Sequence, residues 1–273
     1  MPDTGAGVAA GPQRIAAAFS GHGRTAALMP YLMGGFPSLE ESLEVGRAYA
    51  EHADLVELGV PFSDPLADGP AIQAAGHRAL QGGATLERVL ADVAAPLSED
   101  VPVVVMGYAN PILTRGYERT AALLSEYGAS GLIVPDMPAA EAAELRAVCD
   151  AAGIALVPLV APTTPPAEAR RIAESARGFV YVVSVTGVTG ERAALPPELG
   201  DVVGRVRAAA SVPAAVGFGV GTPEQAAAVG RIADGVIVGS RLVRAIADAD
   251  SLEQGLEDVR AFMRQTANLL AES

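Results

Sequence analysis

The stretch LVELGVPFSDPLADGP, residues 55–70, joins a short apolar run to a loop dense in proline, aspartate and glycine. The run contains one acid, Glu57, and ends at Gly59. Apolar neighbours on both sides of Glu57 indicate a strand that is buried on both faces, where a carboxylate is costly unless it has a partner or a function. The loop adds Asp64 and Asp68, and a helical pattern follows it. The stretch therefore predicts a strand, a polar loop and a helix in succession.

The same succession recurs along the chain. Apolar runs rich in Val, Ile and Leu alternate with amphipathic segments, which is the pattern of a parallel sheet with crossover helices. Eight such units, with no obvious edge strand, predict a (β/α)8 TIM barrel rather than the alternative, a doubly wound open sheet. We also expect an extra helix before the first strand and extra helices in the βα loops. The predicted strands are 27–35, 54–59, 102–107, 131–136, 154–160, 178–184, 212–219 and 234–240.

Helix start and stop signals support this division of the chain. Ser38, with Glu41 three residues on, forms a capping box, and Thr85 stands at a second N-cap position. A further helical segment begins at Pro138 and stops at Gly153.

Length and composition limit the organisation. The 273 residues are 50% hydrophobic, enough for one large core, and we expect a single TIM-barrel domain over residues 1–273 with residues 1–10 as a disordered tail. No apolar run approaches membrane-spanning length, and the start lacks the features of a signal peptide. A cytoplasmic location is the expectation. The net charge of −13 argues against a nucleic-acid partner.

Missing residue types exclude several kinds of chemistry. The sequence has no lysine, which rules out a lysine Schiff base and a lysine anchor for pyridoxal phosphate within this chain. Its three histidines, His22, His52 and His77, have no paired spacing and no cysteine cluster nearby, so we expect no metal site. They are expected on helices, facing solvent or packing. The single cysteine, Cys149, excludes a disulfide.

Two acids are the main candidates for catalysis. In a barrel the active face lies at the C-terminal ends of the strands, where Glu57 and Asp68 are expected. Burial would raise the pKa of Glu57, whereas a wetter Asp68 would stay ionised, a separation that suits an acid/base pair. The alternative for Glu57 is a salt bridge to an arginine. For Asp64 an Asx turn, and for Asp136 a helix cap, compete with functional roles.

Glycine-rich turns follow the last three predicted strands. Gly190, Gly219 and Gly239 lie in these turns, and Ser240 follows the last of them at the start of a helix. Glycines allow close approach of the backbone, and helix N-termini offer free N–H groups, so the turns predict a phosphate site. The alternative is that each glycine only makes a tight turn. The segment 185–197 is either a mobile lid or an ordinary surface loop.

Several motifs resemble those of the tryptophan synthase alpha chain family. VELGVPFSDPLADGP, MGYANP, VPDMP, GVTG with RAALP, GFGVGTPEQ and DGVIVGS occur in the family's order and spacing, from about Ile15 to the C-terminal helix. The resemblance implies a barrel lyase that cleaves indole-3-glycerol phosphate into indole and D-glyceraldehyde 3-phosphate by a retro-aldol step, with no metal and no cofactor in this chain.

The resemblance also assigns site residues. Glu57 matches the catalytic glutamate, a general acid that protonates C3 of the indole ring. Asp68 matches the catalytic aspartate, which bonds the ring N–H. The phosphate would rest on Gly190, Gly219, Gly239 and Ser240. The other implied substrate contacts are Tyr181, Met106, Ile133, Phe218 and the lid residue Thr189.

The resemblance further implies a pyridoxal-phosphate beta chain as partner, in an α2β2 heterotetramer through which indole passes. The loop 61–70, with Asp64 and Pro65, and the segment 185–197 would carry signals between the two sites. MGYANP, with Tyr108 and Asn110, would lie at the docking surface.

Some positions depart from the family pattern. Val185 stands where an arginine is often found, Phe36 replaces a common aspartate, and the lid is shorter than in some members. These departures concern the lid and the interface and leave the two acids unchanged.

Two rival functions remain open at this point. One is another cofactor-free, phosphate-binding barrel lyase or isomerase. The other is a non-catalytic phosphosugar-binding partner that regulates the beta chain, although such a protein has no need of both acids.

Overall fold

The protein forms a barrel of parallel strands in a computed structural model that describes residues 10–183, 196–217 and 219–272. The strands are β1 Ala27–Met33, β2 Val56–Gly59, β3 Val103–Met106, β4 Gly131–Ile133, β5 Ala155–Val157, β6 Leu159–Val160, β7 Val180–Val183, β8 Ala214–Gly217 and β9 Gly235–Val238. They form one sheet in the order β5-β4-β3-β2-β1-β9-β8-β7-β6. Its two outer strands, β5 and β6, are consecutive in the chain, so the sheet curves round on itself.

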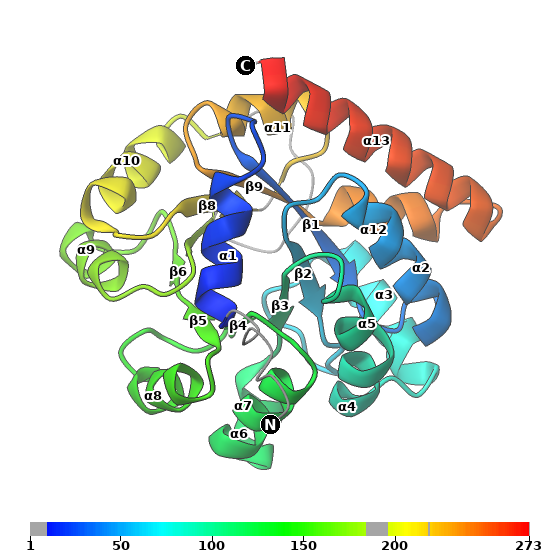
Figure 1. The fold of residues 1–273 in the computed structure, drawn as a ribbon, viewed down its shortest axis with the longest axis horizontal. Coiled ribbons are helices and arrows are strands. Elements are labelled where there is room, and N and C mark those ends of the chain that lie inside the picture. Colours follow the sequence, from blue (N-terminus) through cyan, green and yellow to red (C-terminus); the bar gives the residue numbers. More distant parts are fainter. Residues whose placement is uncertain (1–9, 184–195, 218, 273) are drawn as a thin grey trace, which may run out of the picture.

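Helices surround this sheet, and α1 lies across one end of it (Figure 1). The first half of the chain contains α1 Gly11–Ser20, α2 Leu39–Ala50, α3 Pro70–Gln81, α4 Leu86–Val89, the π-helical turn η1 Leu90–Ala94, α5 Ala95–Leu97, α6 Ala109–Arg115 and α7 Tyr117–Glu126. The second half contains α8 Ala143–Ala151, α9 Pro166–Glu174, α10 Leu199–Ala209, α11 Pro223–Gly230, α12 Ser240–Ala247 and α13 Leu252–Glu272. The predicted TIM barrel is confirmed, with its extra N-terminal helix and its extra helices between β2 and β3.

The fifth predicted strand, residues 154–160, is divided in the structure. Pro158 separates β5 from β6 because proline has no N–H for the hydrogen-bond ladder. Its carbonyl oxygen still accepts a bond from the Tyr181 N–H at 2.9 Å, which ties this point to β7. The eight predicted strands thus become nine, and the break lies at the closure of the barrel.

Capping residues begin the helices as the sequence predicts. The Ser38 hydroxyl accepts the Glu41 N–H at 3.2 Å, and Thr85 accepts the Arg88 N–H at 3.3 Å. The helix expected from Pro138 begins only at α8, because residues 139–141 form turns first.

Helix α1 closes the N-terminal end of the barrel. Its Ile15 is fully buried. A Cβ atom added to Gly131, at the start of β4, would lie 3.3 Å from Ile15 Cδ1, and one added to Gly235, at the start of β9, would lie 2.8 Å from Phe19 Cε1. Glycines at these strand starts therefore make room for α1 to fill this end of the interior.

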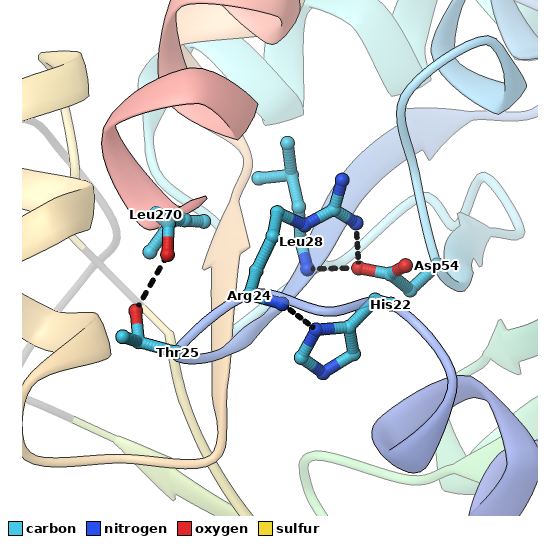
Figure 2. A network of polar contacts seen from close by, with 6 residues as sticks. All are labelled: His22, Arg24, Thr25, Leu28, Asp54 and Leu270. Atoms are coloured by element: carbon cyan, nitrogen blue, oxygen red, sulfur yellow. Dashed lines mark hydrogen bonds and ion pairs between the residues drawn. The ribbon is translucent and has the colours of Figure 1, made fainter. Parts of the chain in front are cut away.

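A polar network fixes the segment between α1 and β1 (Figure 2). Arg24 forms an ion pair with Asp54, whose carboxylate also accepts the Leu28 N–H at 2.7 Å. The Thr25 hydroxyl donates to the Leu270 carbonyl at 3.0 Å, which ties the segment to α13. His22 Nδ1 accepts the Arg24 N–H at 3.0 Å. His22 thus lies in a turn and not on the helix that we expected.

Of the other two histidines expected on helices, only one lies on a helix. His52 lies in a turn after α2, whereas His77 lies on α3 and is exposed. Among the described residues, no helix is both long and apolar enough to cross a membrane.

Replacing Ile15 with Ala tests the closing role of α1. We expect the free energy of unfolding to fall by about 2–5 kcal/mol, because the change leaves a cavity between α1 and the strand starts. Urea unfolding measures this difference. The control is Gln13→Ala on the exposed face of the same helix, which should change stability by less than about 0.5 kcal/mol. Equal effects of the two substitutions would contradict the closing role.

Candidate active site

Glu57 lies near the C-terminal end of β2. The sheet register pairs it with Tyr31 on β1 and with Val104 on β3. Paired residues of parallel strands point to the same face of the sheet, so these side chains share one face. Glu57 is only 2% exposed, and its Oε2 atom has no hydrogen-bond partner among the described residues. An unpaired oxygen in a buried carboxyl group is available for a substrate.

Asp68 reaches the same region from the loop between β2 and α3. It is 4% exposed against 2% for Glu57, so the predicted contrast in exposure has the expected direction but is slight, and Asp68 too is buried. The reason is Tyr108, which follows β3: its hydroxyl accepts the Ala67 N–H at 3.2 Å and hydrogen-bonds the Asp68 carboxylate. Phe62, from the same loop as Asp68, stacks on the Tyr108 ring with 5.1 Å between ring centroids. These contacts fold the loop over the strand end and bury its acid.

The two acids have separated pKa values. Burial, with a smaller contribution from repulsion by Asp68, raises the pKa of Glu57 to about 8. Burial raises the pKa of Asp68 to about 6, although the hydrogen bond from Tyr108 acts in the opposite direction. At neutral pH, Glu57 is therefore mostly protonated and Asp68 mostly ionised. Burial raises both pKa values, and the charge of Asp68 acting on Glu57 and the Tyr108 hydrogen bond to Asp68 help to separate them, so the predicted difference in ionisation remains.

Two further tyrosines lie close enough for the charges of both acids to raise their pKa values. Burial, and then the charges of Glu57 and Asp68, raise the pKa values of Tyr31 and Tyr181, so that both hydroxyls stay protonated. Tyr181 is a predicted site residue, whereas Tyr31 was not predicted from the sequence. The signal was weak, since a tyrosine within an apolar strand is usually part of the core, and only the register with Glu57 reveals its place.

Glycines provide the space for these rings. A Cβ atom at Gly59 would lie 2.0 Å from the Tyr31 hydroxyl oxygen, and one at Gly217 would lie 2.2 Å from that of Tyr181. A real Cβ would displace the tyrosines, so the close approach of each ring requires glycine at these strand ends.

The start of α12 has the features of an anion site. Its N-cap residue, Gly239, supplies no side-chain hydrogen bond, and Ser240 is 9% exposed. By contrast, α11 is capped by its own residues: Thr222 accepts the Gln225 N–H, and the Gly221 N–H donates to Gln225 Oε1 at 2.8 Å. The first N–H groups of a helix have no intrahelical acceptor, so of these two neighbouring helices it is α12 that offers donors to an anion.

Other predicted substrate residues lie at the same end of the barrel. Met106 and Ile133 are buried and form a register pair at the ends of β3 and β4, and Met106 also pairs with Gly59 of β2. Gly219, which follows β8, has a φ of +91°, a conformation that favours glycine. The predicted residues Thr189, Gly190 and Phe218, and the departure at Val185, lie outside the described residues.

The residues that we expected at a partner interface divide into two groups. Asp64 and Asn110 are exposed, and Pro65 is partly buried. Tyr108 is 3% exposed and contacts Asp68, so its side chain lies inside the site rather than on an open surface. The expectation of a surface position was wrong for Tyr108 because the loop that carries Asp68, through Phe62, packs on its ring.

The remaining candidates have structural contacts. Asp136 accepts the Ala109 N–H at 2.9 Å, which confirms the helix-cap alternative for this residue. Phe36 is buried, and the Arg78 guanidinium lies 5.4 Å from its ring centroid. Within the part of the chain that the structure describes, no three His, Cys, Asp or Glu side chains gather as a metal site would require.

Comparisons with known proteins agree on one family. Residues 19–271 match the family model described as "Tryptophan synthase alpha chain". A tryptophan synthase alpha chain from Prochlorococcus marinus is 50% identical over 228 residues, 82% of each chain, and one from Geobacter sulfurreducens is 45% identical over 248 residues, 89% of this chain and 94% of the relative.

Solved structures show the same likeness. Tryptophan synthase from Mycobacterium tuberculosis is 37% identical, with a TM-score of 0.86 over 97% of this chain and 99% of that one. The tryptophan synthase α2β2 complex of Pyrococcus furiosus contains a chain that is 33% identical, with a TM-score of 0.82 over 90% of this chain and 98% of that one.

Replacing Glu57 with Gln tests the burial of its carboxyl group without any substrate. The pKa of Glu57 is raised from 4.5 to about 8, so the stability associated with its protonated form is fully present below pH 4.5 and is lost as pH rises through 8. Glutamine does not titrate. We expect the variant to gain stability relative to the native chain by up to about 1.4 kcal/mol per pH unit across this window. Urea unfolding at pH 5, 7 and 9 measures the difference.

The matched control is Glu99→Gln, which changes an exposed glutamate in a turn. Its stability difference from the native chain should stay flat over the same pH range. A flat difference for Glu57→Gln as well would contradict the buried carboxyl group.

Proposed function

This chain belongs to the tryptophan synthase alpha chain family, and we propose that its Glu57 and Asp68 carry out the cleavage of indole-3-glycerol phosphate to indole and D-glyceraldehyde 3-phosphate. Family membership makes the chain a carbon–carbon lyase of tryptophan biosynthesis. The observation that supports the residue roles is the pair of buried acids with separated pKa values at the C-terminal end of the barrel.

The first step moves a proton to the ring. Glu57, protonated at neutral pH, donates its proton to C3 of the indole, which becomes a cationic indolenine. The positive charge develops at the ring nitrogen, and the ionised Asp68 accepts a hydrogen bond from its N–H and stabilises that charge. Tyr108 holds Asp68 in place through its own hydrogen bond.

The second step breaks the carbon–carbon bond. The Glu57 carboxylate takes the proton from the hydroxyl group on the side-chain carbon that is bonded to C3. That side-chain carbon then forms a double bond to its oxygen. The bond from C3 to the glycerol side chain breaks, and its electron pair returns to the ring, which neutralises the nitrogen and releases indole. Glu57 ends the cycle protonated, so atoms and charges balance without a metal or cofactor in this chain.

The substrate would bind at this same end of the barrel. We place the phosphate at the start of α12, on Gly239 and Ser240, with Gly219 and Gly190 beside it. The indole ring would lie against apolar and aromatic side chains, and Thr189 would close over it. The residues proposed to line the ring are Met106, Ile133, Tyr181 and Phe218.

A beta chain is the proposed partner. The related P. furiosus structure is an α2β2 complex, and we propose the same assembly here, with pyridoxal phosphate in the beta chain and both chains in the cytoplasm. Two exposed large hydrophobic side chains of the described residues support a docking surface: Leu66, in the Asp68 loop, is 80% exposed, and Leu113, on α6, is 56% exposed. Asp64, Pro65 and Asn110 lie on these same two segments. Because Leu66 and Asp68 share one loop, docking would reach the catalytic aspartate directly.

Indole release from indole-3-glycerol phosphate tests the catalytic roles. We expect Glu57→Gln to lower kcat by about 10²–10⁴-fold, because glutamine cannot transfer a proton, and Asp68→Asn to lower it by about 10²–10³-fold. In the native chain, kcat/KM should rise as Asp68 ionises near pH 6 and fall as Glu57 loses its proton near pH 8.

Glu99→Gln serves as the control and should keep native activity. If Glu57→Gln released indole at the native rate, the assigned chemistry would fail. If the folded native chain released none, alone or with a beta chain, the non-catalytic binding role would stand instead.

Replacing Leu66 with Ser tests the docking surface. We expect the Kd for a tryptophan synthase beta chain to rise about 5- to 30-fold, since an exposed leucine that becomes buried in an interface contributes about 1–2 kcal/mol. Isothermal titration calorimetry measures the affinity. Gln13→Ser, at the opposite end of the barrel, is the control. Equal affinities for the two variants would place the interface elsewhere.

A further inference from the structure

The loop between β2 and α3 carries Asp68 without main-chain support of its own. Among the described residues, no residue from 61 to 68 forms a hydrogen bond between main-chain groups. The chain bends at 63–64 and again at 66–67 within this loop. Main-chain groups that do not bond one another need side chains or water as partners. Side chains from neighbouring elements therefore decide where this loop places the Asp68 carboxylate.

Two side chains hold the loop from opposite sides. Tyr108, after β3, bonds the Ala67 N–H and the Asp68 carboxylate. Gln73, near the start of α3, bonds the main chain instead. Its Nε2 amide donates to the Asp68 carbonyl oxygen at 2.8 Å and to the Pro65 carbonyl oxygen at 3.4 Å. A primary amide has two N–H groups, so it can donate to both carbonyls at once.

The place of Gln73 on α3 makes this bridge possible. The Gln73 main-chain N–H donates to the Gly69 carbonyl at 2.9 Å, so its backbone belongs to the helix. Helical side chains point toward the N-terminus of their helix, and here that direction leads back over the loop. Pro65 and Asp68 are three residues apart, the spacing that a main-chain hydrogen bond closes in a β-turn. The Gln73 side chain therefore takes the place of a turn hydrogen bond.

The alternative is that Gln73 only helps α3 to begin. The helix starts with Pro70 after Gly69, and no side chain caps it. An N-terminal cap must accept hydrogen bonds from the first N–H groups, whereas the Gln73 amide donates to carbonyl oxygens that lie outside the helix. Gln73 is also exposed, so it is not a core residue. Its contacts thus act on the loop rather than on the helix.

We propose that Gln73 is a positioning residue, whose side chain holds the main chain of Asp68 so that its carboxylate lies beside Glu57 at the strand ends. Gln73 fixes the main chain of Asp68 and Tyr108 fixes its carboxylate, so together they set the direction of the side chain. This inference rests on the proposed function, because that function gives Asp68 its part in the cleavage.

Loss of the bridge should change the surroundings of Asp68. Burial raises the pKa of Asp68 to about 6, and the Tyr108 hydrogen bond acts in the opposite direction. A loosened loop brings water to the carboxylate and weakens that hydrogen bond. Burial is the larger of the two influences, so the pKa should fall toward its usual value of 3.8. The other titratable groups that interact with Asp68 stay unchanged, and they are Tyr31 of β1, Glu57 of β2, Tyr108 after β3 and Tyr181 of β7.

Replacing Gln73 with Met tests the proposal, because methionine has a similar length but no N–H donor. We expect NMR titration of the aspartate side chains in the full, ligand-free chain to place the pKa of Asp68 at least about one pH unit lower than in the native chain. We also expect kcat/KM for indole release to fall about fivefold to tenfold. The loss should lie mainly in kcat, because Asp68 acts on charge that develops during the reaction.

The matched control is Gln81→Met, which changes another exposed glutamine of α3, one whose amide contacts His77. It should leave the Asp68 pKa and kcat/KM as they are in the native chain. A double mutant then separates positioning from a general effect on the fold. In the Asp68→Asn background, Gln73→Met should change kcat/KM by less than about twofold, because the group that it positions is gone. Urea unfolding checks that each variant is folded.

Three results would overturn the positioning role. They are a native Asp68 pKa in Gln73→Met, a loss of activity no greater than that of Gln81→Met, and an equal loss with Asp68 and with Asn at this position. A lowered pKa together with native indole release would support the positioning role and contradict the catalytic role of Asp68. Because the NMR titration uses no substrate, failure of this inference is distinguishable from failure of the proposed function.

Discussion

Burial of the Glu57 carboxyl group beside a second buried acid is the constraint on which the rest of the site depends. A carboxyl group held at a strand end, with one oxygen unpaired in the described structure, favours its protonated form. The arginine salt bridge that would have stabilised its charge is not among the contacts of the described residues. The barrel therefore retains at neutral pH a proton that water would remove, and that proton is the one the proposed chemistry needs.

The surroundings of Glu57 preserve this state. The one charge that shifts the pKa of Glu57 among the described residues is that of Asp68, which is negative and so disfavours ionisation of Glu57. Tyr31 and Tyr181 reach the site only because Gly59 and Gly217 leave space above the strand ends. The Tyr108 hydroxyl, by contrast, favours the ionised form of Asp68. One shared environment thus keeps one acid neutral and the other charged, through burial in the first case and a single hydrogen bond in the second.

The two ends of the barrel divide stability from function. The N-terminal end is filled by α1, and the Arg24–Asp54 ion pair ties the segment before β1 to the segment before β2 (Figure 2). At the C-terminal end, one oxygen of Glu57 has no hydrogen-bond partner among the described residues, and the start of α12 has no side-chain cap. Unpaired groups cost stability, so they persist where a ligand satisfies them. Because the contacts of α1 stabilise the N-terminal end of the barrel, the C-terminal end can keep polar groups that lack a partner.

Local patterns in the sequence were enough to predict the kind of fold and the two acids. Apolar runs alternating with capped helices specify a parallel barrel, because hydrophobic periodicity and capping are local properties. The apolar flanks of Glu57 indicated its burial, and the motif around it indicated the family. Only the tertiary structure decided which groups meet. Asp68 is buried because Tyr108, forty residues further along, covers its loop, and Tyr31 belongs to the site through a strand register that no local pattern encodes. Pro158 was visible in the sequence, but only the strand order reveals that its break lies between the two outer strands, where the barrel closes. Burial depends on contacts between distant segments, and so do the pKa values that the chemistry uses.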